Sequence, residues 1–181
     1  MKSDSIRIAN CSGFYGDKLS VARDMIEGGP IDVLTGDYLA ELTMTILYNQ
    51  RLKRGEQHGY VGTFLKQFRD IAKLAQEKNI KIVTNAGGLN PSSMAESVKE
   101  IIDELNLDLK VAHIEGDDLM PRIDELYQGG ENLTNIDKSL DLQKYEKKPI
   151  TANAYLGAWG IKEALDNGAD VVICPRVTDA A

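Results

Sequence analysis

Five short apolar runs separated by helical segments constrain the fold of this chain more than any other feature. The runs lie near residues 5–10, 31–35, 80–84, 109–114 and 170–174. Between them apolar residues recur with a period near 3.6, which indicates amphipathic helices. Strands that alternate with helices form right-handed βαβ units and a mostly parallel sheet. The sequence therefore predicts an α/β fold, a doubly wound, Rossmann-like sheet with helices on both faces; part of a (β/α) barrel is the alternative.

Several helix boundaries are marked by residues with known capping preferences. Asn90 is a natural N-cap, and Pro91 suits the first position of the helix that follows it. Asn79 is a suitable stop for the helix before it. Residues 129–150 are polar and lack a clear period, so we expect an irregular or hairpin insert there.

The size and composition of the chain fit one globular domain. Its 181 residues are 43% hydrophobic and 27% charged, and we interpret residues 1–181 as a single α/β domain. The net charge of -7 argues against a nucleic-acid partner. No apolar run is long enough for a membrane span or a signal peptide. Cys11 and Cys174 are far apart and fit reduced thiols, so we expect a cytoplasmic protein that does not bind membranes.

The sequence stops directly after the fifth predicted strand, in the segment 176–181. A parallel strand without a covering helix would expose Val171, Val172 or Ile173, which monomeric proteins generally avoid. We therefore expect the chain to be the N-terminal part of a longer domain or protein, or to bury this edge against another chain, for example in a homo-oligomer.

Small and polar residues follow every predicted strand. In parallel α/β folds ligands bind beyond the carboxyl ends of the strands, so these residues predict a polar cleft for a small molecule. The segments are Asn10-Cys11-Ser12-Gly13, Thr35-Gly36-Asp37, Asn85-Ala86-Gly87-Gly88-Leu89-Asn90, Glu115-Gly116-Asp117-Asp118 and Arg176-Val177-Thr178-Asp179.

The turn at Gly87-Gly88 suggests anion binding. Two glycines before a helix allow close backbone approach, and the N–H groups of a helix N-terminus attract a phosphate or carboxylate. The alternative is a tight strand-to-helix turn with ordinary capping.

Carboxylates after the strands could act as acid and base or hold Mg²⁺. The candidates are Asp37, Glu115, Asp117, Asp118 and Asp179. The alternative is that Asp37 and Asp117 or Asp118 cap the helices that follow them. Cys11 also follows a strand, but most such cysteines are small buried hydrophobes.

Several of these segments together resemble the acyclic terpene utilisation family of the AtuA type. The resemblance covers nearly the whole chain and rests on residues Ile8–Asp17, Gly28–Thr43, Asn85–Pro91, Glu115–Leu119, Ala152–Ile161 and Arg176–Asp179. The chain departs from the family pattern where Pro175 replaces a glycine before Arg176.

The resemblance implies a role in the catabolism of citronellol- and geraniol-type terpenes, alongside acyl-CoA enzymes. We expect an enzyme acting on a branched acyl-CoA or related carboxylate, such as a lyase, hydratase or hydrolase; a non-catalytic subunit that binds acyl-CoA or a partner is the alternative. Mg²⁺ and a CoA thioester substrate both remain candidates. The catalytic candidates are Asp37, Glu115, Asp117 and Asp179, and the ligand-binding candidates are Asn10, Ser12, Gly13, Thr35, Gly36, Asn85, Gly87, Gly88, Asn90, Asn153 and Arg176.

Overall fold

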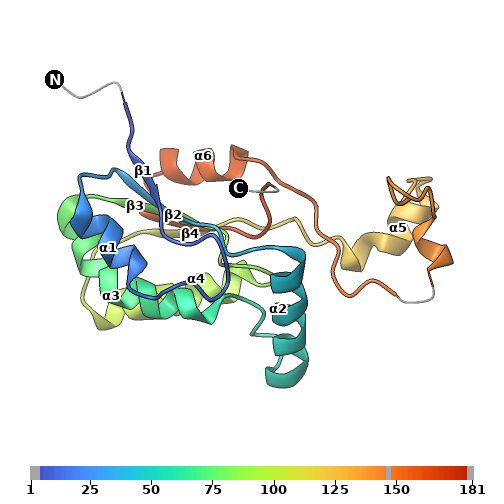
Figure 1. Cartoon of the computed structure of the whole chain (residues 1–181), viewed down its shortest axis with the longest axis horizontal. Helices are drawn as coiled ribbons and strands as arrows, with labels where there is room; N and C mark the ends of the chain where they lie inside the picture. Colours follow the sequence, from blue (N-terminus) through green and yellow to red (C-terminus); the bar gives the residue numbers. More distant parts are fainter. Residues whose placement is uncertain (1–4, 146–147, 179–181) are drawn as a thin grey trace.

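The computed structural model describes residues 5–145 and 148–178 and shows an α/β fold (Figure 1). The strands are β1 (Ile8–Asn10), β2 (Val33–Gly36), β3 (Lys81–Thr84), β4 (Val111–His113) and β5 (Val171–Ile173). The α-helices are α1 (Val21–Gly28), α2 (Glu41–Arg54), α3 (Gly62–Lys78), α4 (Pro91–Glu104), α5 (Ile123–Gln128) and α6 (Trp159–Asp166), with short 3-10 turns η1 (Met120–Arg122) and η2 (Leu142–Lys144). All five predicted strands are confirmed. None of the helices within these residues is long and apolar enough to cross a bilayer.

The five strands form one parallel sheet in the order β1-β2-β3-β5-β4. The chain moves outward from β1 to β3, passes over to β4 and returns to place β5 between β3 and β4. This reversal is typical of a doubly wound sheet, whereas strands of a (β/α) barrel neighbour one another in chain order. It creates the crevice in which α/β sheets bind ligands.

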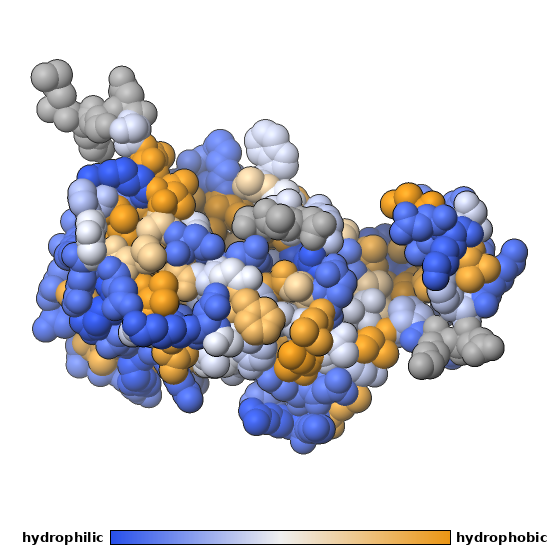
Figure 2. All heavy atoms as spheres, viewed as in Figure 1, coloured by the Kyte–Doolittle hydropathy of each residue, from blue (hydrophilic) through white to orange (hydrophobic). Residues whose placement is uncertain are grey.

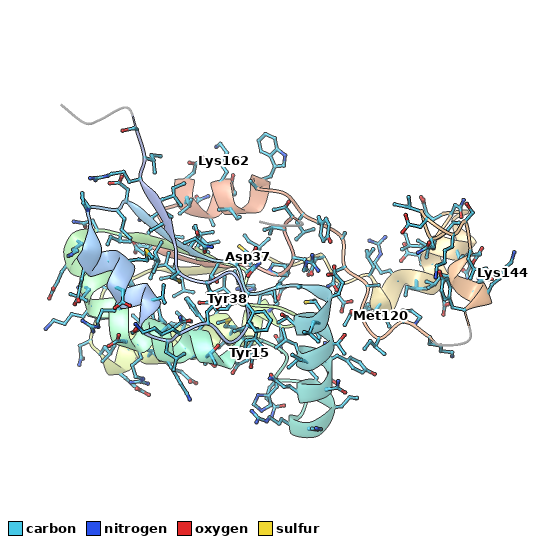
Figure 3. All side chains as sticks on the ribbon, in the orientation of Figure 1. Tyr15, Asp37, Tyr38, Met120, Lys144 and Lys162 are labelled. Carbon is cyan, nitrogen blue, oxygen red and sulfur yellow. The ribbon has the colours of Figure 1, made fainter. Side chains whose placement is uncertain are left out.

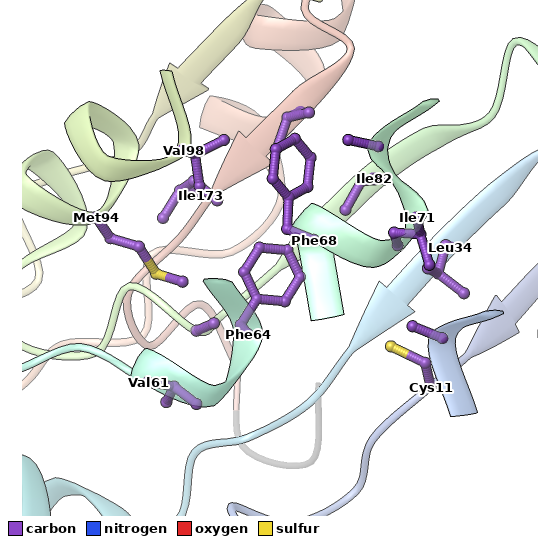
Figure 4. Close-up of a cluster of buried hydrophobic side chains, with 14 of the residues drawn as sticks. Cys11, Leu34, Val61, Phe64, Phe68, Ile71, Ile82, Met94, Val98 and Ile173 are labelled. Carbon is purple, nitrogen blue, oxygen red and sulfur yellow. The ribbon is translucent and has the colours of Figure 1, made fainter. Parts of the chain in front are cut away.

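The main core lies between the sheet and the helices α1, α3 and α4, which share one face (Figure 1). Leu34 and Ile82 point from the strands into this core. Phe64 and Phe68 of α3 stack with ring centroids 6.0 Å apart and meet them from the helix side (Figure 4). These residues are buried because the apolar stripe of α3 repeats at helical spacing toward the sheet.

Helix α6 covers part of the opposite face (Figure 1). Its Ile161 and Leu165 pack against Val172 and Cys174, and against Val83 of the neighbouring strand. This cover ends before β1, where Ile8 is 65% exposed.

Burial of β5 corrects one prediction from the sequence. Val171, Val172 and Ile173 are at most 1% exposed, so the premise that this strand lacks a covering helix is wrong. The physical reason is the strand order: β5 lies inside the sheet, and α4 and α6 cover its two faces.

The predicted insert, residues 129–150, projects from the body of the molecule together with η1 and α5, and the labelled Met120 and Lys144 lie well away from the sheet (Figures 1 and 3). Antiparallel bridges join Asp118 to Asn153 at its base and Thr134 to Asp141 further out. No residue described between 118 and 150 is buried. The prediction of an irregular, partly hairpin-like insert is confirmed.

Candidate functional site

A cavity of about 410 Å³ opens at the carboxyl ends of β2, β3 and β5. We call it the strand-end cavity. It lies between these strand ends and the start of α6, beside the reversal in strand order. Its lining is Thr35, Gly36, Asp37, Val83, Thr84, Asn85, Gly157, Ala158, Ile161, Cys174, Val177 and Thr178.

Asp37 and Asn85 form a hydrogen-bonded pair in this cavity. Nδ2 of Asn85 donates to Oδ1 of Asp37 at 2.6 Å, while Oδ1 of Asn85 accepts from the backbone N–H of Tyr38 at 2.8 Å. Asn85 is buried, so both ends of its amide orient the half-buried carboxylate. Tyr38 is itself anchored because its hydroxyl donates to Gln67 at 2.6 Å. Figure 3 shows Asp37 at the strand ends, between α2 and α6.

The capping interpretation of Asp37 is wrong. Helix α2 begins at Glu41 with Ala40 as its N-cap residue, and no side chain caps it. Asp37 lies in the segment before this helix. Its backbone N–H donates to the carbonyl of Ser12, in the loop after β1. Its carboxylate therefore faces the cavity instead of the helix.

The loop after β1 uses its donors internally. Oδ2 of Asp17 accepts from the backbone N–H groups of Gly13 and Phe14, at 2.8 and 3.1 Å, and from Oγ of Ser12 at 3.3 Å. Asn10 is exposed and accepts from the Thr35 hydroxyl at 3.4 Å. Of the predicted ligand residues in this region, Thr35 and Gly36 line the cavity. Asn10, Ser12 and Gly13 do not line it.

The turn at Gly87-Gly88 has the predicted shape but not the predicted donors. Gly88 has a positive φ of 56°, as expected for a turn that favours glycine. However, the N–H groups of Gly87, Gly88, Leu89 and Asn90 bond to carbonyl groups within the protein. The N–H of Ser93 bonds to the Asn90 side chain at 3.1 Å. The expectation of exposed N–H groups is therefore wrong for all of these residues, which build a tight, capped turn.

A second polar group lies next to the cavity. The buried Asp117 carboxylate accepts from Nδ2 of Asn153 at 2.7 Å and from the Arg176 backbone. The buried guanidinium of Arg176 donates to Tyr155 at 2.9 Å and to the exposed Glu41 at 3.1 Å. This group is next to the cavity in the chain, because Val177, the residue after Arg176, lines the cavity. Gly157, which also lines it, donates its N–H to the carbonyl of Val177 at 2.7 Å.

Burial raises the pKa of Asp117, and its hydrogen bonds only partly oppose this. A carboxyl whose folded pKa lies above its unfolded pKa binds its proton more tightly in the folded state, so its ionisation destabilises the fold as pH rises. We expect Asp117→Asn to gain stability relative to the unmutated protein as pH rises from about 4, the ordinary pKa of an aspartate, through the raised pKa of Asp117. Urea unfolding of both proteins at several pH values measures this difference. A difference that shrinks or reverses with rising pH would contradict the assignment.

The remaining carboxylate candidates do not converge. Glu115 is exposed, with Oε1 3.4 Å from Nε2 of His113. Asp118 accepts from the backbone N–H of Met120 at 2.9 Å, but it is not the N-cap residue of the turn or helix that follows, so the capping alternative is wrong for it as well. Asp179 lies outside the described residues. Within the residues described, no group of three histidine, cysteine or acidic side chains could hold a metal ion.

Sequence reasoning missed the apolar wall of the cavity. Val83, Ile161, Cys174 and Val177 come from segments far apart in the chain, and no local pattern links them. Both cysteines are free and buried. Burial raises the pKa of Cys174 to about 12, so its thiol stays protonated at neutral pH.

A parallel sheet with a reversed strand order and a mostly apolar cavity at its strand ends defines an α/β protein with a cleft where such folds commonly bind ligands. Comparison with protein families then identifies it more closely. The chain belongs to the acyclic terpene utilisation family: the model described as "Acyclic terpene utilisation family protein AtuA" matches residues 6–181. No curated protein and no solved structure shows significant similarity to it. Family membership links the chain to the utilisation of acyclic terpenes.

Proposed function

We propose that the chain is part of an enzyme that acts on a branched acyl-CoA or related carboxylate derived from an acyclic terpene. The strand-end cavity takes the branched chain, and Asp37 contacts its polar end. The observation that carries the proposal is a single carboxylate, oriented by Asn85, inside a mostly apolar cavity.

The walls of the cavity suit a branched hydrocarbon. Val83, Ile161 and Val177 present branched apolar side chains, and ligand clefts commonly have volumes of about 300–1,000 Å³. The cavity is near the lower end of that range, at about 410 Å³. Burial of apolar ligand surface contributes roughly 25 cal/mol per Å², so the branched chain supplies most of the binding free energy.

Asp37 is suited to proton transfer. An ionised carboxylate only accepts hydrogen bonds. In Asp37, the bond from Asn85 uses one lone pair of one carboxylate oxygen. The other lone pairs can accept a proton from a ligand carbon or hydroxyl, or orient a water molecule. These steps belong to lyase, hydratase and hydrolase reactions, which are the classes expected from the sequence.

A coenzyme A group would lie outside the cavity. Its phosphates favour lysine and arginine, and none of the described lining residues is basic. The acyl part would then enter from the mouth near Ala158 and Thr178, which are exposed.

Filling the cavity tests this proposal. We expect Val83→Phe to weaken binding of a branched ten-carbon acyl ligand at least tenfold, since the larger ring occupies the space of the branched chain. Val33→Phe is the matched control, because Val33 lies on the same face of the neighbouring strand and is not part of the lining. Calorimetric titration of both folded variants gives the affinities. Equal affinity in the two variants would reject the cavity as the ligand site.

Turnover separates the enzyme from the binding subunit. Incubation with a branched acyl-CoA, followed by mass spectrometry, should detect a product that disappears in Asp37→Asn. Tight binding without any product would favour the non-catalytic subunit.

A further inference from the structure

The charge and hydrogen-bonding pattern of the strand-end cavity narrows its substrate class. We propose that the ligand group that meets Asp37 is uncharged and donates a hydrogen bond, as a hydroxyl group does, and that a free carboxylate is excluded from this position. The inference rests on the proposed ligand site.

The charge of the lining supports a neutral ligand group. Asp37 is the only charged residue among the described lining residues. A ligand carboxylate beside it would place two negative charges close together in a partly apolar space, where their repulsion is poorly screened. A hydroxyl group avoids this repulsion.

Two basic side chains from the segments around the cavity, those of Arg176 and Lys162, are directed elsewhere. Arg176 lies over the ring of Tyr155, with its guanidinium carbon 4.9 Å from the ring centroid, and pairs with Glu41. Lys162 of α6 pairs with Asp166 and points away from the sheet (Figure 3). Neither residue lines the cavity.

Three polar side chains of the lining, Thr35, Thr84 and Asn85, donate hydrogen bonds within the protein. The Thr35 hydroxyl donates to the Ala9 carbonyl at 3.3 Å, and the Thr84 hydroxyl donates to Gly36 at 3.0 Å. Asn85 donates to Asp37 itself. An anion needs several donors, whereas Thr35 and Thr84 direct theirs to backbone carbonyl groups and Asn85 directs one to Asp37.

Three backbone N–H groups of the lining also donate within the protein. The N–H of Asp37 bonds to Ser12, that of Asn85 to Gly36 and that of Gly157 to Val177. The carboxylate oxygens of Asp37 are therefore the strongest hydrogen-bonding groups of the cavity, and they require a donor. Among the head groups considered for the proposed function, a neutral thioester on a hydroxylated chain is compatible with this pattern, and a free carboxylate is not.

Two ligands with the same branched skeleton test the inference: citronellol, an alcohol, and citronellic acid. Calorimetric titrations at pH 7.5 should show that the unmutated protein binds the alcohol at least tenfold more tightly than the acid. In Asp37→Asn the negative charge is lost, and the preference should fall below about threefold. Asp124→Asn, which removes the same charge from the exposed surface of α5, should keep the original preference.

The outcomes separate the two proposals. Equal or tighter binding of the acid by the unmutated protein overturns the inference and leaves the ligand site in place. An unchanged preference in Asp37→Asn also overturns it, because the selectivity would then come from another group. If neither ligand binds at millimolar concentration, or if Val83→Phe binds both as the unmutated protein does, the ligand site itself is wrong and the inference falls with it.

Discussion

Replacing Gly88 with valine is expected to lower the free energy of unfolding by about 2–6 kcal/mol. Gly88 has φ of 56°, a conformation that β-branched residues rarely adopt. A Cβ atom there would lie 2.3 Å from Cδ1 of Leu47 and 2.8 Å from the carbonyl oxygen of Gly59. Strain and overpacking each cost roughly 1–3 kcal/mol, so the variant should unfold at a much lower urea concentration.

Gly62→Ala is the control for this experiment. Gly62 begins α3, and a Cβ atom there would meet no other atom within 4 Å. Its stability should change by less than about 1 kcal/mol, in the stabilising direction. If Gly88→Val kept full stability and lost only ligand affinity, the turn would be an anion site after all.

Phe68→Ala is expected to cost about 3–5 kcal/mol of stability. Phe68 is 0% exposed and stacks on Phe64 in the core between α3 and the sheet (Figure 4). Truncation removes the buried ring and leaves a cavity that close-packed neighbours fill only in part.

Phe14→Ala is the matched control, because Phe14 is 51% exposed in the loop after β1. We expect it to change the unfolding free energy by less than about 1 kcal/mol. Chemical denaturation of both variants measures the contrast. Similar losses in the two proteins would mean that the main core does not lie between α3 and the sheet.

Some apolar side chains remain on the surface of the protein. Figure 2 shows apolar side chains between the polar ones on the viewed face. Exposed apolar residues include Ile8 and Trp159, the latter 80% exposed at the start of α6. Ile8 lies on β1, beyond the part of the sheet that α6 covers, in contrast to the buried strand β5.

Local signals in the sequence determined the elements of the fold. Asn90 caps α4 as predicted, because its side chain needs only the Ser93 N–H of the following turn. Asn79 ends α3 in the left-handed conformation, with φ of 53°. The strands were also predictable, since runs such as 171–173 are short, apolar and bounded by polar breaks. Each of these features depends on neighbours within a few residues.

Tertiary structure alone decided which strand-end residues form the site. Asp37 could cap a helix or face a cavity, and its bond to Asn85, which follows β3, places it at the cavity instead of at the helix start. The N–H groups of the Gly87-Gly88 turn could bind an anion, but carbonyl groups of Cys174 and Gly59 take two of them. The placement of β5 between β3 and β4 is also a tertiary feature, because no local pattern in the sequence specifies the order of strands in a sheet. The physical reason is the same in each case: a polar group bonds to whatever the fold brings within reach, and that partner comes from a distant part of the chain.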